Sequence, residues 1–263
     1  MAEWLVLSIA MTTACALVLG IALLSQRRLG PRASGEGEGE GEGPAQQTPD
    51  VLEYTTMMIG VVYAIVLGLA IAGVWEARGA AQDDVRREAQ ALHEITQRAE
   101  VLPSEVREKI RADIGGYVSY VVDTEWPRMI AGDGLSPHGA ELLDAVRKDI
   151  AGRMPANDLE AQVYQPMVEQ AAVAADARST REQNAGSTLP GVVWFGLIIG
   201  ALVTVGLIFT MRMGRSAREL LIAGLFSALI TFLLFLVWNF DAPFGRTGTD
   251  SADAFRVLFP GST

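Results

Sequence analysis

The sequence predicts an all-α integral membrane protein, with four transmembrane helices and a soluble helical bundle between the second and the third. Half of the 263 residues are hydrophobic, and they gather in four runs without a charged side chain: Trp4–Leu24, Thr55–Trp75, Gly191–Met211 and Leu220–Trp238. Each run is close to the roughly 20 residues that a helix needs to cross about 30 Å of hydrocarbon. Between the second and third runs, apolar residues recur at the three- and four-residue spacing of amphipathic helices.

The first transmembrane helix is predicted within residues 1–26. A secretory signal peptide is the alternative, but the starting "MAE" lacks a positive charge and no small-residue cleavage site follows the apolar run. Residues 27–52 form a predicted flexible linker, because the Gly-Glu alternation from Gly35 to Gly43 repels itself and buries nothing. These glutamates lack the ligand spacing and turn glycine of a calcium-binding EF-hand loop.

The second transmembrane helix, residues 53–77, is predicted to continue into water without a Gly-Pro break. An unbroken helix from Tyr54 to Leu102 would be roughly 70 Å long at 1.5 Å per residue. In the membrane part, small residues recur at every fourth position and would let another helix approach closely: Gly60, Ala64, Gly68 and Ala72. The water-exposed part continues as an apolar stripe formed by Val85, Leu92, Ile95, Ala99 and Leu102.

Residues 78–188 are predicted to form the soluble bundle, with three helices besides the long one. The first begins at Pro103 and ends at Trp126-Pro127, since proline disfavours helix at the preceding residue. The second begins at Ser136-Pro137, an N-cap followed by a first-turn proline. The third runs from about Leu159 to Arg181, and Pro166 is a candidate kink. The inward faces are expected to hold Ile110, Ile114, Tyr117 and Val121 in the first, Leu142, Val146 and Ile150 in the second, and Val163 and Met167 in the third.

Residues 189–240 contain the third and fourth transmembrane helices, and residues 241–263 form a C-terminal tail. The third helix again has small residues at every fourth position, Gly196, Gly200 and Thr204.

Arginines in the short loops predict the orientation, because basic residues near the ends of membrane helices stay in the cytoplasm. They follow the first span and separate the last two, at Arg27, Arg28, Arg32, Arg212, Arg215 and Arg218. This distribution places the N-terminus, the bundle and the tail outside the cytoplasm. The opposite orientation is favoured by arginines that flank the bundle, Arg78, Arg86, Arg87, Arg178 and Arg181, but these belong to a long domain and count less.

The sequence offers no recognisable catalytic motif, and we expect a protein that is not an enzyme and uses no cofactor or metal. The two histidines, His93 and His138, are not spaced as a pair, and the single Cys15 excludes an intrachain disulfide or a cysteine-based zinc cluster. Asp123 and Glu125 are two residues apart and therefore face different sides of a helix. A net charge of −10, without a basic cluster outside the short loops, argues against nucleic-acid binding.

Five ordered motifs then resemble a known family: "GVVYAIVLGLAIAGVWEA", "VRREAQAL", "EWPRM", "LPGVVW" and "DAPFG". They are similar to those of bacterial membrane proteins with a bestrophin-like domain, and the resemblance extends from Tyr54 over nearly all of the remaining chain. The motif residues are expected to have structural roles, as an interfacial anchor, a helix cap that touches the membrane surface, or a turn that folds the tail back. They are Trp75, Glu76, Glu125, Trp126, Pro127, Pro190, Asp241, Pro243, Phe244 and Gly245.

A weaker resemblance extends to the bestrophins themselves, which are pentameric anion channels whose second membrane helix lines the pore. This resemblance implies a homo-oligomer in a lipid bilayer, with Met57, Val61 and Ile65 at the pore neck. Bestrophins prefer aromatic residues there, and they keep their soluble part in the cytoplasm, opposite to the orientation that the arginines predict. The sequence thus suggests an oligomeric anion channel in the plasma membrane of a bacterium. The alternative is a non-conducting membrane scaffold or sensor whose bundle docks a partner.

Overall fold

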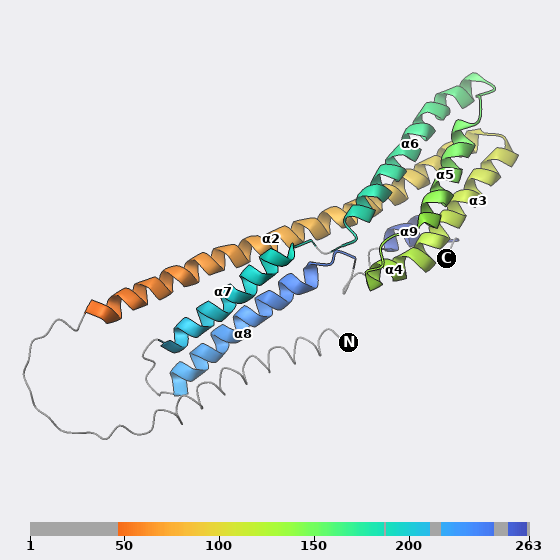
Figure 1. Ribbon diagram of the computed structural model, residues 1–263. Helices are drawn as coiled ribbons and strands as arrows, with labels where there is room; N and C mark the ends of the chain where they lie inside the picture. Colours follow the sequence, from red (N-terminus) through yellow and green to blue (C-terminus); the bar gives the residue numbers. More distant parts are fainter. Residues whose placement is uncertain (1–46, 187, 211–216, 245–251, 262–263) are drawn as a thin grey trace, which may run out of the picture. The chain divides into compact units, whose positions relative to one another are not determined.

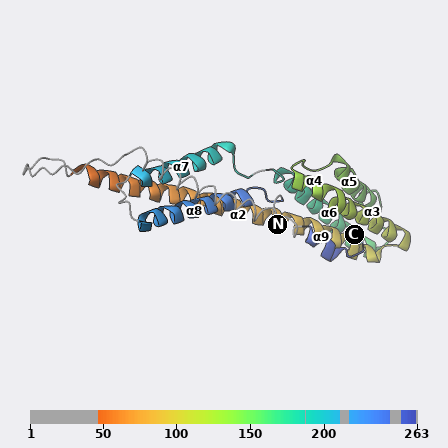
Figure 2. The same ribbon diagram turned by 90° about the horizontal axis from the view of Figure 1, so that it is seen from below.

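The computed structural model describes residues 47–186, 188–210, 217–244 and 252–261 (Figures 1 and 2). Within these ranges all regular structure is helical and there is no strand, which confirms the all-α class. The predicted first transmembrane helix and most of the Gly-Glu linker lie outside the described residues.

The chain divides into two compact units, here called the membrane unit and the bundle unit. The membrane unit combines Met1–Gly73 with Leu189–Trp238, and the bundle unit combines Val74–Thr188 with Asn239–Thr263. The long helix α2, Gln47–Arg98, contributes its first part to the membrane unit and its second part to the bundle unit. The predicted continuous helix is therefore present up to Arg98, where α2, of 52 residues, ends and the 3-10 turn Ala99–Val101 follows.

The membrane unit contains the first part of α2 together with α7, Gly191–Thr210, and most of α8, Ala217–Phe240. Helix α2 buries Tyr63, Leu67 and Ala70, which recur at four- and three-residue spacing. The Tyr63 hydroxyl donates a hydrogen bond to the backbone carbonyl of Leu197 in α7, at 3.2 Å. The ring of Tyr63 lies against Gly200, where a Cβ atom would come within 2.6 Å of it. Glycine at this position is what lets α2 and α7 pack this closely.

Two helices in the described ranges are long and apolar enough to cross a membrane, Tyr54–Val101 and Leu221–Phe240. Helix α7 contributes a shorter apolar stretch, Gly191–Leu207. The second and fourth predicted transmembrane helices thus have the required length and composition. A total of four spans stays a prediction, because the first lies outside the described residues and the third is shorter.

The bundle unit is built from the second part of α2 and from helices that follow it in sequence (Figure 1). These elements are η1 (Ala99–Val101), α3 (Ser104–Tyr120), the π-helical turn η2 (Val121–Glu125), α4 (Trp126–Ala131), α5 (Pro137–Ala151), α6 (Asp158–Gln183) and α9 (Asp253–Leu258). Ser136 is the N-cap of α5 as predicted, and its hydroxyl accepts a hydrogen bond from the backbone N–H of His138. The inward face of α5 differs by one residue from the prediction, since Leu143 rather than Leu142 is buried with Val146 and Ile150.

The prediction that Trp126-Pro127 ends a helix is wrong. The backbone N–H of Trp126 bonds to the carbonyl of Val121, so the chain widens into a π-helical turn before the proline. Pro127 then lies in the first residues of α4, directly after this widened turn. The helix ends instead at Gly132, whose φ of 87° suits glycine.

The predicted C-terminal tail packs on the bundle and contains the short helix α9. Phe255 and Ala252 are buried in the same hydrophobic core as Leu92, Ile95 and Trp126. Phe259 meets the ring of His93 edge to face, with 5.9 Å between the ring centroids. The tail is thus part of the bundle unit.

We expect Phe255→Ala to lower the free energy of unfolding by about 3–5 kcal/mol, because it removes a fully buried ring from the core. Val257→Ala is the matched control in the same helix, since Val257 is 74% exposed. Chemical unfolding of the detergent-purified protein, followed by circular dichroism, measures the difference. Equal stability of the two variants would show that α9 does not pack on the bundle.

Candidate functional site

The first candidate site is an apolar face of α2 in the membrane unit that is largely exposed among the described residues. Met57, Val61 and Ile65 are 62%, 55% and 58% exposed. At 100° per residue they lie on the opposite side of the helix from Tyr63, Leu67 and Ala70, which pack inside the unit. The three residues of the predicted pore neck therefore share one open face, and they are apolar throughout.

The small-residue stripe of α2 borders this open face. No side chain or other helix comes within 4 Å of the Cβ positions of Gly60 and Gly68, and Ala64 and Ala72 are exposed. The close helix contact that the stripe predicts is thus not made within the described residues. The contact that does form uses Gly200 of α7 instead.

The second candidate site is a buried ion-pair cluster in the bundle unit, formed by Glu88, Tyr117, Glu125, Arg178 and Arg181. Arg181 donates from Nε to Glu88 Oε2 at 2.8 Å and from Nη2 to Glu88 Oε1 at 3.1 Å. Arg178 donates from Nη1 and Nη2 to the two oxygens of Glu125, at 2.7 Å and 2.6 Å. Two bidentate pairs with balanced charge therefore lie inside the bundle.

Further hydrogen bonds join the two pairs. The Tyr117 hydroxyl donates to Glu88 Oε1 and accepts from Arg178 Nη1 at 3.2 Å. Glu125 Oε1 accepts the backbone N–H of Ser136 at 3.1 Å, and Arg178 Nη2 donates to the carbonyl of the same residue at 3.0 Å. Arg181 also contacts Glu125 Oε2 at 3.5 Å. The cluster thus connects α2, α3, η2, the start of α5 and α6.

The environment of the cluster shifts the pKa values of Glu125 and Tyr117. Burial acts to raise the pKa of Glu125, but the hydrogen bonds and charge of Arg178, together with Arg181, outweigh it and lower that pKa below its usual value. Burial and then the negative charge of Glu88 raise the pKa of the Tyr117 hydroxyl, which stays a hydrogen-bond donor. The Glu125 carboxylate therefore stays charged and the Tyr117 phenol stays neutral, and both join helices through their hydrogen bonds.

Gly139 in the first turn of α5 is required by this cluster. A Cβ atom at this position would collide with Glu125 Oε1 and would lie 2.6 Å from Arg178 Nη2. Every other residue type would therefore push the ion pair apart.

The sequence contains a signal for this cluster, which is the placing of charged residues at core positions of the helices. Glu88 falls on the apolar stripe of α2 between Val85 and Leu92, and Glu125 follows Tyr117 and Val121 on the inward face of its helix. Arg178 and Arg181 follow Ala174 on the buried face of α6. Charged residues at core positions, two of each sign, predict mutual burial as pairs.

The motif residues near Trp75 and Trp126 form two aromatic contacts within the bundle unit. Trp75 is 62% exposed and meets the ring of Phe240 at 5.2 Å between centroids, and the Arg78 guanidinium lies over the same ring at 5.3 Å. Trp126 is buried against Phe244, at 5.7 Å between centroids. The expectation that this helix cap touches the membrane surface is therefore wrong for Trp126.

The remaining motif residues lie at chain turns or on the surface. The carbonyl of Asp241 accepts the backbone N–H of Thr188 at 2.9 Å, and Pro243 is buried beside Phe244. Pro190 directly precedes α7, and its carbonyl accepts the N–H of Val193. Glu76 and Pro127 are exposed, and Gly245 lies outside the described residues.

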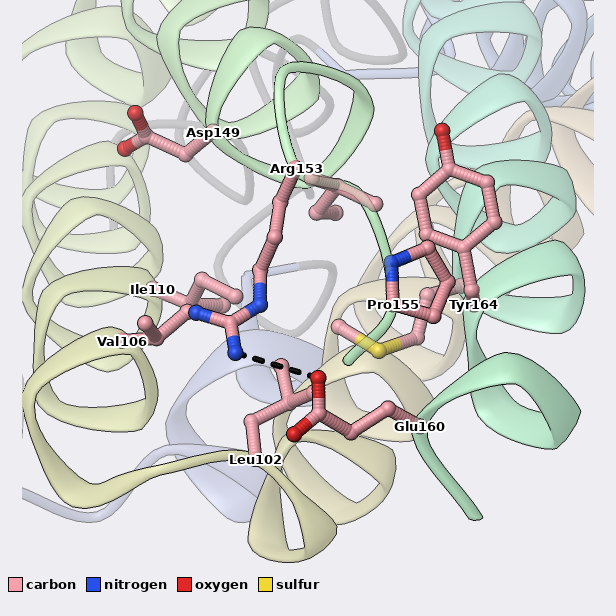
Figure 3. Close-up of a pocket in the computed structure, with 10 residues that line it drawn as sticks. Leu102, Val106, Ile110, Asp149, Arg153, Pro155, Glu160 and Tyr164 are labelled. Carbon is pink, nitrogen blue, oxygen red and sulfur yellow. Dashed lines mark hydrogen bonds and ion pairs between the residues drawn. The ribbon is translucent and has the colours of Figure 1, made fainter. Parts of the chain in front are cut away.

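A small cavity lies among α3, α5 and α6 of the bundle (Figure 3). Its walls are mostly apolar, with Leu102, Val106, Ile110 and Met167 among them. At its mouth Arg153 donates to Glu160 at 3.1 Å, and Glu160 also accepts the backbone N–H of Ala156. These bonds fix the loop between α5 and α6. Across the described ranges, no group of three His, Cys, Asp or Glu side chains is arranged to hold a metal ion.

The described residues form a helical fold in which a large helical bundle stands in sequence between the apolar helices α2 and α7. The chain belongs to the family with a bestrophin-like domain, whose model matches residues 12–248. This membership confirms the resemblance seen in the sequence motifs.

Solved structures show the same fold. A bacterial bestrophin homologue from Klebsiella pneumoniae, in a point-mutant form, aligns with a TM-score of 0.66 at 13% identity, covering 97% of this chain and 98% of that one. A mutant of a crystallised membrane protein aligns with a TM-score of 0.68 at 12% identity, covering 97% of both chains. A search of curated proteins gives no match.

We expect Gly139→Ala to destabilise the protein by about 1–3 kcal/mol, the usual cost of forcing extra volume into a packed site. Gly116→Ala is the control, because Gly116 lies within α3 and a Cβ there meets no atom within 4 Å. Alanine should stabilise that position by about 0.5–1 kcal/mol through helix propensity. Opposite signs in urea unfolding support the close approach to the ion pair, and a neutral or stabilising Gly139→Ala contradicts it.

Proposed function

We propose that the protein is an oligomeric ion channel, with the open face of α2 from each copy turned toward a shared pore axis. The observation that supports this proposal is the uncovered line of Met57, Val61 and Ile65 in a chain of the bestrophin-like family. The fold likeness to a bacterial bestrophin homologue adds support. The transported ion we propose is an anion, by analogy with the bestrophins.

The chemistry of this face suits a hydrophobic gate. Residues four apart lie one turn, about 6 Å, along a helix. Met57, Val61 and Ile65 from several copies would thus form three stacked apolar rings. Such a constriction blocks ions by excluding water, and it conducts when it widens enough to fill.

A scaffold or sensor is the second candidate function, and the composition of the open face favours it. Tyr63, one of the few polar residues of the span, turns inward to Leu197, so it cannot supply a polar ring to a pore. An apolar face without such a ring also suits lipid or the helix of a partner membrane protein. Neither candidate includes catalysis, and we propose that the protein is not an enzyme.

We also propose that the protein lies in the plasma membrane of a bacterium with its bundle outside the cytoplasm. The arginines of the two short loops support this orientation. The chain has 31 acidic and 21 basic residues, but the acidic residues contribute little to orientation.

The channel proposal predicts a symmetric oligomer in native mass spectrometry and chloride flux in liposomes that contain the purified protein. Ile65→Ala should increase this flux, because a smaller side chain widens the apolar neck. Val66→Ala is the matched control, since it removes the same kind of volume from a different face of α2. A monomer, or an oligomer without flux in either variant, would leave the scaffold as the function.

The orientation is tested by labelling a single cysteine at the bundle surface. Met154 is 91% exposed, so Met154→Cys in a Cys15→Ser background presents one accessible thiol. A membrane-impermeant maleimide should label it in spheroplasts before lysis. Labelling only after lysis would place the bundle in the cytoplasm.

A further inference from the structure

The short helix α4 of the bundle unit has an outer face that is exposed among the described residues. Trp126 and Met129 are 4% and 2% exposed and pack in the bundle core. Pro127, Ile130 and Ala131 are exposed, and Ile130 keeps 45% of its surface accessible. At 100° per residue these three span about 100° of the helix surface. Helix α4 therefore has a continuous apolar outer face beside its buried one.

This helix lies close to the point where the chain leaves the membrane. The apolar span Leu221–Phe240 ends four residues before Phe244, whose ring packs against Trp126 with 5.7 Å between centroids. Four extended residues reach at most about 14 Å, and a helix measures about 5 Å from its axis to its surface. Within the bundle, α4 lies at the end opposite the turn between α5 and α6 (Figure 1). Its outer face is thus within reach of the lipid headgroups that surround the end of the span.

Aromatic and basic residues mark the level of the membrane surface in the same unit. The charge-free part of α2 ends at Trp75, which is 62% exposed and contacts the ring of Phe240. The Arg78 guanidinium, one turn later, lies over the same ring. Exposed tryptophan followed by a basic residue is typical of the boundary between hydrocarbon and water. The two apolar spans therefore end together at Phe240, four residues from the partner of Trp126.

Arg128 adds a positive charge to the edge of the outer face. Its side chain is exposed and makes no ion pair or hydrogen bond with the residues that the structure describes. The next acidic residue, Asp133, follows Gly132, after the helix has ended. A guanidinium suits paired hydrogen bonds to a phosphate group. An apolar face with a basic edge is the pattern of a helix that lies on a lipid surface.

We propose that the outer face of α4 rests on the lipid headgroup layer, with Ile130 turned toward the acyl chains and Arg128 hydrogen-bonded to headgroup phosphates. Trp126 itself stays buried, and its contact with Phe244 holds α4 at this level. A helix of six residues therefore need not bind lipid unaided. The inference requires that the chain spans a membrane, and it holds for a channel and for a scaffold alike.

Spin labels on single cysteines test this contact in the full chain, reconstituted in nanodiscs of phosphatidylcholine and phosphatidylglycerol. Ile130→Cys and Ala131→Cys, each in a Cys15→Ser background, report from the outer face. Met154→Cys is the control, because Met154 is 91% exposed in the turn between α5 and α6. Molecular oxygen concentrates in lipid and a nickel chelate in water, so the ratio of their collision rates with the label measures its depth.

We expect the oxygen-to-nickel ratio at positions 130 and 131 to exceed the ratio at position 154 several-fold. A ratio at the two outer positions equal to that at position 154 would overturn the inference, because the face would then border water. Low collision rates with both reagents would also overturn it and assign the face to a second copy or to another part of the chain.

The phosphate contact is tested by reversing the charge of Arg128 in the protein labelled at position 130. Arg128→Glu should lower the oxygen-to-nickel ratio in the mixed nanodiscs, because anionic headgroups repel a carboxylate, and should lower it less in phosphatidylcholine alone. Arg147→Glu is the matched control, since Arg147 is exposed on α5, and it should leave the ratio unchanged. An equal ratio in the Arg128→Glu and Arg147→Glu proteins would contradict the contact between Arg128 and phosphate.

Discussion

The buried cluster of two glutamates and two arginines is the interaction on which the bundle depends. Removing four charged groups from water costs several kcal/mol each, and only close, well-oriented partners offset it. The partners come from α2, η2 and α6, which are far apart in the sequence. An apolar core tolerates small sliding of helices, whereas two bidentate ion pairs do not. The cluster therefore fixes the register of these elements in a core that is otherwise rich in alanine and valine.

Local irregularities of the bundle follow from the same cluster. The π-helical turn adds one residue before Trp126, and the two residues at this point, Glu125 and Trp126, both face inward. The side chain of Ser136 caps α5, and its backbone N–H donates to Glu125. The start of α5 therefore lies directly against Glu125. Gly139 completes the arrangement, because only hydrogen fits between its Cα atom and the ion pair. One electrostatic constraint thus accounts for a widened turn, a capped helix and a glycine.

Residue patterns along the chain predict single helices better than they predict these contacts between helices that are far apart in sequence. Uncharged runs identify α7 and α8, and the Ser136-Pro137 cap identifies the start of α5, because length and capping are local properties. The end of a helix at Pro127 was predicted wrongly, since a π-helical turn depends on what the side chain of Glu125 must reach. Helix α9 was missed because six residues give too little periodicity. Its burial depends on Phe255 meeting α2, a contact that no local pattern contains.

The roles of the different faces of α2 in the membrane unit cannot be predicted from the sequence pattern. Packing against α7, lining a groove, facing lipid and gating a pore all require apolar side chains, so hydropathy cannot separate them. The surroundings separate the faces: Tyr63 is buried, bonded to Leu197 and packed on Gly200, whereas Val61 is 55% exposed among the described residues. An open apolar face is stable in lipid, yet between several copies it would border water and would exclude it. The function of this face is therefore decided by assembly, and the same three side chains would be inert in a monomer.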